Sequence, residues 1–127
     1  MIVVDASAAV SALLNDGRAR QVLRNERLHA PHLIDSEVTS ALRRQVQRSR
    51  IAAGDGWTAL DVWRRIALTR YPVIGLLDRV WELRDNLSAY DATYVALAES
   101  LGCALVTLDA RLSNAARQRC SITVVPS

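Results

Sequence analysis

The 127-residue sequence contains no lysine, only two cysteines and no apolar run long enough to cross a membrane. Cys103 and Cys120 lack an accompanying CxxC pair or a matching pair of histidines, which excludes a zinc site built on this spacing. We therefore expect both to be buried, reduced thiols. The N-terminus also lacks a basic segment followed by a small-residue cleavage site, so we expect a cytoplasmic protein with no membrane partner.

Arginine takes the place of lysine and supplies all 16 basic residues, against 13 acidic ones. A guanidinium forms two parallel hydrogen bonds with a phosphate. A chain whose basic residues are all arginine and whose pI is near 9.4 therefore indicates an anionic partner. The base composition of the genome is the alternative explanation. No linker or repeat interrupts the chain, so residues 1–127 are expected to form a single domain.

Short apolar runs alternate with stretches of helical periodicity along the whole sequence. This alternation predicts an α/β fold in which helices cover both faces of a mainly parallel sheet. Folds of this kind bind their ligands beyond the carboxyl ends of the strands. The expected strands are residues 1–5, 28–31, 71–74, 103–109 and 121–126, and the expected helices are residues 7–14, 19–25, 33–48, 55–67, 77–85, 88–101 and 110–117.

Two carboxylates follow directly on expected strands, and two more lie near the starts of expected helices. Asp5 ends the strand that opens the chain, and Asp109 ends the run 105–108 in the same manner. Asp91 shares a helical stripe with core residues, and Glu37 lies at the margin of its helix's apolar face. Taken one at a time, each acid also has a local explanation as a helix cap or a first-turn residue.

Four carboxylates that meet at one sheet edge need a partner of opposite charge. Two of them about 4 Å apart repel by roughly 4 kcal/mol at an effective dielectric near 20. A proton, an arginine or a cation relieves this repulsion, and oxygen ligands favour Mg²⁺ or Mn²⁺ over zinc. Such ions activate water and stabilise phosphoryl oxygens, so the pattern favours hydrolysis of a polyanionic substrate.

Segments of the sequence resemble the PIN-domain ribonucleases, and more narrowly the VapC-type toxin subunits of VapBC toxin–antitoxin pairs. The segments are MIVVDASA, EVTSALRR, YDATYVALAESLG and LVTLDARL, and the resemblance extends over essentially the whole chain. It implies a three-layer α/β/α sandwich with an acidic pocket for Mg²⁺ or Mn²⁺. It also implies an endoribonuclease that hydrolyses a phosphodiester bond and leaves a 5′-phosphate and a 3′-hydroxyl.

The resemblance assigns the acids, position by position, to the catalytic pocket. These are Asp5, Glu37, Asp91 and Asp109. Asp5 and Asp91 are expected to be the firmest metal ligands, with the other two completing the pocket directly or through water. Ser7 and Thr107 are expected to steady the carboxylates or bound waters; a helix-start cap and ordinary strand packing, respectively, are their alternatives.

The resemblance also implies an RNA substrate, a cognate antitoxin and a homodimer. The antitoxin is expected in a hydrophobic groove lined by helices that carry Leu42, Trp57 and Trp63, with core packing as the alternative for these residues. Tyr90 is a candidate for stacking on an RNA base, whereas core packing suits Tyr94 better. Transfer, ribosomal and messenger RNA all stay open as targets.

Two other enzyme classes also place an aspartate at the end of a first strand. Phosphatases of the haloacid-dehalogenase type need a second aspartate where this chain has Ser7, and both they and receiver domains need a lysine. The alternative that these absences leave open is a non-catalytic RNA- or protein-binding module whose acids only cap helices.

Overall fold

The computed structural model describes residues 1–114 and 119–126, and a parallel sheet forms its centre. The strand order is β3-β2-β1-β4-β5, and each neighbouring pair is parallel. The strands are β1 (Ile2–Val4), β2 (Leu28–Pro31), β3 (Leu68–Tyr71), β4 (Ala104–Thr107) and β5 (Ile122–Val124). The first strand of the chain therefore lies in the middle of the sheet, between β2 and β4.

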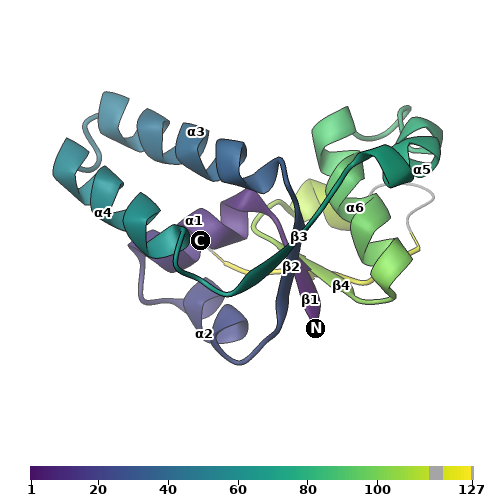
Figure 1. Cartoon of the computed structure of the whole chain (residues 1–127), viewed down its shortest axis with the longest axis horizontal. Coiled ribbons are helices and arrows are strands. Elements are labelled where there is room, and N and C mark those ends of the chain that lie inside the picture. The colour runs from purple at the N-terminus through teal and green to yellow at the C-terminus, as the bar shows by residue number, and fades with distance from the viewer. Residues whose placement is uncertain (115–118, 127) are drawn as a thin grey trace.

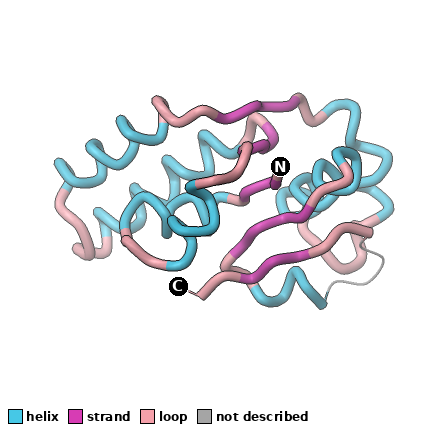
Figure 2. The backbone as a smooth tube through the Cα atoms, turned by 90° about the horizontal axis from the view of Figure 1, so that it is seen from below, coloured by secondary structure: helices cyan, strands magenta, loops and turns pink. Residues whose placement is uncertain are grey.

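Helices cover both faces of this sheet (Figure 1). They are α1 (Ala6–Leu14), α2 (Arg18–Arg24), α3 (Ile34–Gln47), α4 (Ala53–Trp63), α5 (Leu77–Glu82) and α6 (Ala89–Leu101), with the 3-10 helices η1 (Ile74–Leu76) and η2 (Ala110–Asn114). Helices α1 to α4 lie on one side of the strands and α5 and α6 on the other, and Figure 2 shows the same division from below. The predicted three-layer α/β/α fold is confirmed. In the part of the chain that the structure describes, no helix has the length and apolar character needed to span a membrane.

The core lies between the middle strands and helix α6. Val3 and Val4 of β1 and Leu105 and Val106 of β4 are fully buried. Residues 92–98 of α6 are all buried as well, because this helix packs against the sheet and against α5. Burial of the strands on both faces accounts for their continuous apolar runs in the sequence.

The direction of α6 decides which of its ends reaches the carboxyl edge of the sheet. The helix ends at Leu101 and is closed by Gly102, whose φ of 66° is the left-handed conformation that glycine adopts readily. β4 begins directly afterwards, so α6 runs opposite to the strands and its first turn lies at their carboxyl ends. Helices α1, α3 and η2 start at the same edge, because they follow β1, β2 and β4.

The edge strand β3 lies earlier in the chain than predicted. It covers Leu68–Tyr71 and not residues 71–74, because residues 68–71 pair in register with β2. Pro72 has no N–H with which to continue the ladder. The apolar stretch that suggested a strand forms η1 and the start of α5, where Ile74 and Leu77 are exposed.

Two helices also differ from their predicted bounds. Helix α4 begins at Ala53 without a side-chain cap and ends at Trp63, so Asp55 is a first-turn residue and not the cap. The helix packs against α3. The helix expected over residues 110–117 is the 3-10 helix η2, and residues 115–117 lie outside the described ones.

A charged cluster ties the start of α3 to β3 and to the end of α4. Asp35 accepts hydrogen bonds from Arg70 Nε (2.7 Å), Arg70 Nη2 (2.9 Å) and Trp63 Nε1 (2.8 Å). The hydrogen-bonded Arg70 guanidinium lowers the pKa of Asp35. Since the same first turn of α3 carries Glu37, this cluster fixes the helix end that delivers Glu37 to the sheet edge. Trp63 is buried, so core packing is right for this tryptophan.

Helices α3 and α4 approach each other closely at Gly56. A Cβ atom there would lie 2.9 Å from Cγ2 of Val46, whereas a Cβ at Gly54 would meet nothing within 4 Å. We expect Gly54→Ala to stabilise the protein by about 0.5 kcal/mol, because alanine is the better helix former. Gly56→Ala forces the helices apart and is expected to cost about 1–2 kcal/mol. Urea unfolding measures both; equal stabilisation by the two variants would contradict this close packing.

Candidate active site

Asp5 lies at the carboxyl end of β1 and is only 7 % exposed. Its Oδ1 accepts hydrogen bonds from the Ser7 hydroxyl (2.7 Å) and the Ala8 N–H (3.0 Å), so Asp5 also caps helix α1. Its Oδ2 accepts a hydrogen bond of 2.5 Å from the Thr107 hydroxyl. The carboxylate is therefore held from two sides, by the helix that follows it and by β4.

The hydroxyls of Ser7 and Thr107 connect the ends of β1 and β4 around Asp5. Their oxygens lie 3.3 Å apart. Ser7 Oγ accepts the Leu108 N–H at 2.9 Å, and Thr107 Oγ1 accepts the Asp109 N–H at 3.0 Å. Thr107 is fully buried, and its hydroxyl fixes the backbone that carries Asp109 as well as the Asp5 side chain. The N-cap of α1 is Asp5 and not Ser7.

Glu37 lies in the first turn of α3 and contacts the middle of α6. Its Oε1 accepts a hydrogen bond of 2.5 Å from the hydroxyl of Tyr94. The Tyr94 side chain is in the core as predicted, with 2 % exposure, but no local sequence pattern indicates its hydrogen bond to Glu37. Burial raises the pKa of Glu37; the charges of Asp91 and Asp5 raise it further, while Tyr94 opposes the shift.

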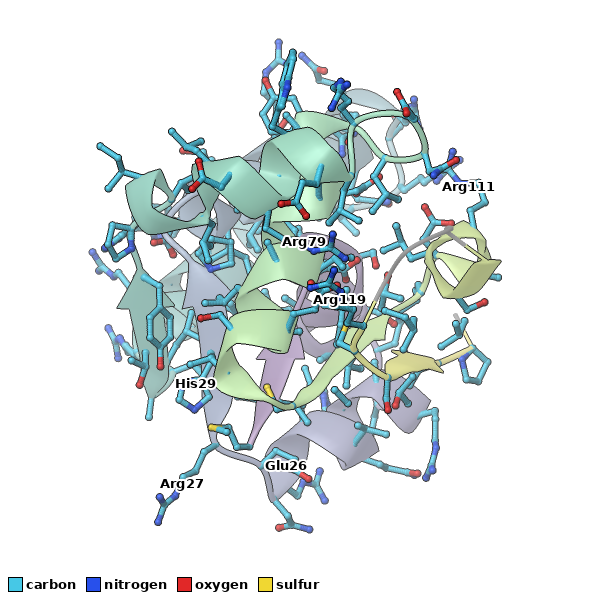
Figure 3. The ribbon with its side chains drawn as sticks, turned by 90° about the vertical axis from the view of Figure 1, so that its right-hand side faces the viewer. Glu26, Arg27, His29, Arg79, Arg111 and Arg119 are labelled. Atoms are coloured by element: carbon cyan, nitrogen blue, oxygen red, sulfur yellow. The ribbon has the colours of Figure 1, made fainter. Side chains whose placement is uncertain are left out.

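Asp91 and Asp109 come to the same edge from α6 and β4. The Asp91 N–H donates to the Ser88 hydroxyl at 3.1 Å, and Ser88 thereby caps α6. Asp109 is paired with Arg111, which was not predicted: Nη2 donates to Oδ2 at 2.5 Å, and both Nε and the backbone N–H donate to Oδ1 at 3.0 Å. Arg111 is 84 % exposed and lies at the rim of the molecule in Figure 3.

The acids act on one another through space. Burial raises the pKa of Asp5, and the charge of Asp91 adds to the rise. Burial also raises the pKa of Asp91, with Asp109 adding to it. The pKa of Asp109 is lowered instead, because Arg111 donates hydrogen bonds to its carboxylate. Together with the effect of Asp5 and Asp91 on Glu37, these influences place the four acids in one region at the carboxyl edge.

The side chains of this region offer oxygen donors, which suit Mg²⁺ or Mn²⁺. Oδ2 of Asp5 receives only one hydrogen bond and keeps a free lone pair, whereas both oxygens of Asp109 are occupied by Arg111. Over residues 1–114 and 119–126, no three acidic, histidine or cysteine side chains stand close enough to hold a metal ion. Movement of the exposed Arg111 would free Asp109, because solvent screens a surface ion pair of this kind.

Comparison with known proteins identifies the family. The sequence matches the PIN domain over residues 2–118. Ribonuclease VapC9 of Mycobacterium tuberculosis is 67% identical over 126 residues, which cover 99% of this chain and 99% of that protein. Ribonuclease VapC1 of the same organism is 41% identical over 128 residues, with 97% and 96% covered. The chain therefore belongs to the PIN-domain family and, within it, to the VapC ribonucleases. The predicted ribonuclease of the VapC toxin type is confirmed, and the non-catalytic alternative is set aside.

Solved structures agree on the fold. VapC20 of Mycobacterium tuberculosis, described as a sarcin-ricin loop cleaving toxin, matches with a TM-score of 0.67 at 20% identity over 91% of this chain and 95% of that one. VapBC2 of Rickettsia felis, bound to a DNA fragment from its promoter, matches with a TM-score of 0.71 at 14% identity over 97% and 98%. At these identities the likeness establishes the fold alone.

Removal of the Asp91 charge is expected to stabilise the protein. Because the folded-state pKa of Asp91 lies above its ordinary value of 3.8, the ionised carboxylate destabilises the fold, and wild-type stability rises as the pH falls through the raised pKa. In EDTA, we expect Asp91→Asn to unfold at a higher temperature than wild type near neutral pH. This advantage is expected to shrink as the pH falls toward 3.8.

Asp78 is the matched control, because it is an exposed acid in the first turn of α5. Asp78→Asn removes only a favourable interaction with the start of its helix and is expected to lower stability slightly at neutral pH. Calorimetric melting temperatures of the three proteins across this pH range measure the difference. Parallel curves for wild type and Asp91→Asn would contradict the assignment of a raised pKa.

Proposed function

We propose that Asp5, Glu37, Asp91 and Asp109 are the catalytic residues of a divalent-metal-dependent endoribonuclease. The supporting observation is their convergence at the carboxyl edge, where burial and mutual repulsion raise the pKa values of Asp5, Glu37 and Asp91. Asp5, Glu37 and Asp91 have no ion-pair partner among the described residues, and a hard divalent cation would supply the compensating charge. Mg²⁺ or Mn²⁺ fits the oxygen donors, with Asp5 and Asp91 as the firmest ligands and the other two acids binding directly or through water.

Hydrogen bonds from neighbouring residues orient the carboxylates of Asp5 and Glu37. Bound Mg²⁺ or Mn²⁺ supplies an activated water and charge stabilisation at the leaving oxygen. Ser7 and Thr107 orient Asp5 so that the spare lone pair is on Oδ2. Tyr94 occupies Oε1 of Glu37, and the raised pKa of this carboxyl suits Oε2 to accept the proton of the attacking water. In-line hydrolysis then leaves a 5′-phosphate and a 3′-hydroxyl.

The surroundings of the pocket favour a polyanion such as RNA. The charge of Arg44 on α3 influences Glu37, and that of Arg111 influences Asp91, so guanidinium groups lie within electrostatic range of the acids. Arg111 is exposed and can exchange Asp109 for an RNA phosphate. The substrate is accordingly structured or single-stranded RNA, with transfer, ribosomal and messenger RNA as the candidate pools.

Asp5→Ala tests the assignment of the pocket. With Mn²⁺ and total cellular RNA, we expect wild type to create a small set of new 5′-phosphate ends, and Asp5→Ala to reduce their yield about a hundredfold or more. Asp85→Ala, which removes an equally charged but exposed carboxylate, is expected to cleave like wild type. Mapping of the 5′-phosphate ends, with EDTA as a second control, measures this. Undiminished cleavage by Asp5→Ala, or undiminished Mn²⁺ binding by Asp91→Ala in calorimetry, would refute the assignment.

We also propose that a cognate antitoxin binds the apolar surface around α4. Leu42, Val46, Trp57 and Leu60 line a groove of about 290 Å³ between α3 and α4, and the Trp57 side chain is exposed there. A second hollow of about 510 Å³ opens between α1, α2 and α4. An apolar segment of an antitoxin fits such grooves. The homodimer implied by the resemblance is proposed on that ground alone, and sedimentation of the isolated chain tests it.

Trp57 is the side chain most suited to anchor the antitoxin. Exposed tryptophans in apolar grooves are typical binding hot spots, so we expect Trp57→Ala to weaken the complex with the cognate antitoxin about tenfold or more. Trp81→Ala is the control, because Trp81 is also exposed but lies on α5, on the other side of the sheet. Titration calorimetry compares the two. Equal affinities of wild type and Trp57→Ala would contradict the proposed groove.

A further inference from the structure

Tyr90 is an exposed aromatic residue beside the acidic pocket, and neither the fold nor the proposed catalysis uses it. It lies in the first turn of α6 directly before Asp91, and 64 % of its surface is exposed. Core packing therefore accounts for little of its ring. Among the described residues, no hydrogen bond or ring contact involves the Tyr90 side chain.

Helix geometry places Tyr90 at the rim of the pocket. Residues four apart lie above one another on a helix, with Cβ atoms about 6 Å apart. Tyr90 is therefore the outward neighbour of Tyr94, whose hydroxyl holds Glu37 at 2.5 Å. Because α6 begins at the carboxyl edge of the sheet, the turn that carries Tyr90 faces the same solvent as the carboxylates.

The other exposed aromatic rings of the described chain are already covered by a cation. The Arg64 guanidinium lies 5.5 Å from the centre of the Trp57 ring, and that of Arg84 lies 4.6 Å from the Trp81 ring. Tyr90 has no such partner in the described part, so no guanidinium covers the exposed part of its ring.

We propose that Tyr90 stacks on an unpaired base of the RNA and thereby positions the strand at the catalytic acids. This inference deepens the proposed function and depends on it for the identity of the substrate. The carboxylates repel phosphates, and stacking on a base adds an attraction to RNA that does not rely on charge. A base inside a duplex is already stacked on both sides, so Tyr90 selects nucleotides that are single-stranded or extruded from a loop.

Binding without catalysis separates this proposal from the assignment of the acids. The probes are a fluorescently labelled single-stranded hexanucleotide of RNA and a blunt RNA duplex of mixed sequence, measured by anisotropy in EDTA. We expect Tyr90→Ala to bind the single strand about tenfold more weakly, within the range for loss of one stacked base. Tyr90→Phe keeps the ring and is expected to bind like wild type, and binding of the duplex is expected to change little.

Trp81→Ala is the matched control, because it removes an exposed aromatic ring of similar exposure from the neighbouring helix α5. It is expected to leave single-strand binding unchanged. Unchanged melting temperatures for both alanine variants would show that neither ring is structural. With Mn²⁺ and cleavable RNA, Tyr90→Ala is expected to raise KM about tenfold and to change kcat much less.

Several results would overturn the proposal. These are wild-type affinity in Tyr90→Ala, an equal loss in Trp81→Ala, a loss in Tyr90→Phe as large as that in Tyr90→Ala, and no binding of the single strand by wild type. Cleavage that depends on Asp5 but not on Tyr90 would overturn the stacking role alone. Tyr90-dependent binding in EDTA would support it even where Asp5→Ala still cleaves.

Discussion

The hydrogen bond from Thr107 to Asp5 is the contact around which the pocket is built. It joins the ends of the neighbouring strands β1 and β4 through residues 102 positions apart. The same Thr107 hydroxyl accepts the Asp109 N–H, and the same Asp5 carboxylate caps α1. One buried contact thereby fixes the position of two acids and the start of one helix. It also explains why a carboxylate is tolerated at this depth, since each of its oxygens has a donor.

The ionised carboxylates of the pocket lower the stability of the fold. Burial and mutual repulsion raise the pKa values of Asp5, Glu37 and Asp91, so each ionised group costs folding free energy. The compensation lies elsewhere in the molecule, where acids are paired. Asp35 accepts hydrogen bonds from Arg70 and Trp63. Glu99 accepts hydrogen bonds from the Arg79 guanidinium and from the Arg119 N–H, and Figure 3 shows Arg79 and Arg119 close to each other. The raised pKa values of Asp5, Glu37 and Asp91 therefore contrast with the lowered pKa of the paired Asp35, and carboxylates with raised pKa values are typical of functional sites.

Local patterns were sufficient to predict the layers of the fold and the edge where the acids gather. Asp5 and Asp109 directly follow apolar runs, and Asp91 interrupts a buried helical stripe. Each of these local patterns marks its aspartate as a candidate site residue. No local pattern predicts the contacts of Tyr94 with Glu37 and of Arg70 with Asp35, because these residues are 57 and 35 positions apart. The bounds of the edge strand were predicted wrongly because Leu68–Tyr71 is only partly buried and contains two polar residues, whereas the more apolar stretch after it forms no strand and exposes Ile74 and Leu77. The pairing of Arg111 with Asp109 is predictable from sequence, because the two residues stand only two positions apart in the chain.

The order of the strands has a consequence for the synthesis of the chain. β1 is made first but is completed as a sheet element only when β4 arrives, because β4 is its neighbour on one side. A growing polypeptide that ends before residue 107 lacks both the donor for Asp5 Oδ2 and Asp109 itself. On the proposed assignment of Asp5 and Asp109 to catalysis, activity has to wait until most of the polypeptide has been translated. For an enzyme that degrades RNA, a site divided in this way would keep the incomplete chain from cleaving RNA while it is still being synthesised.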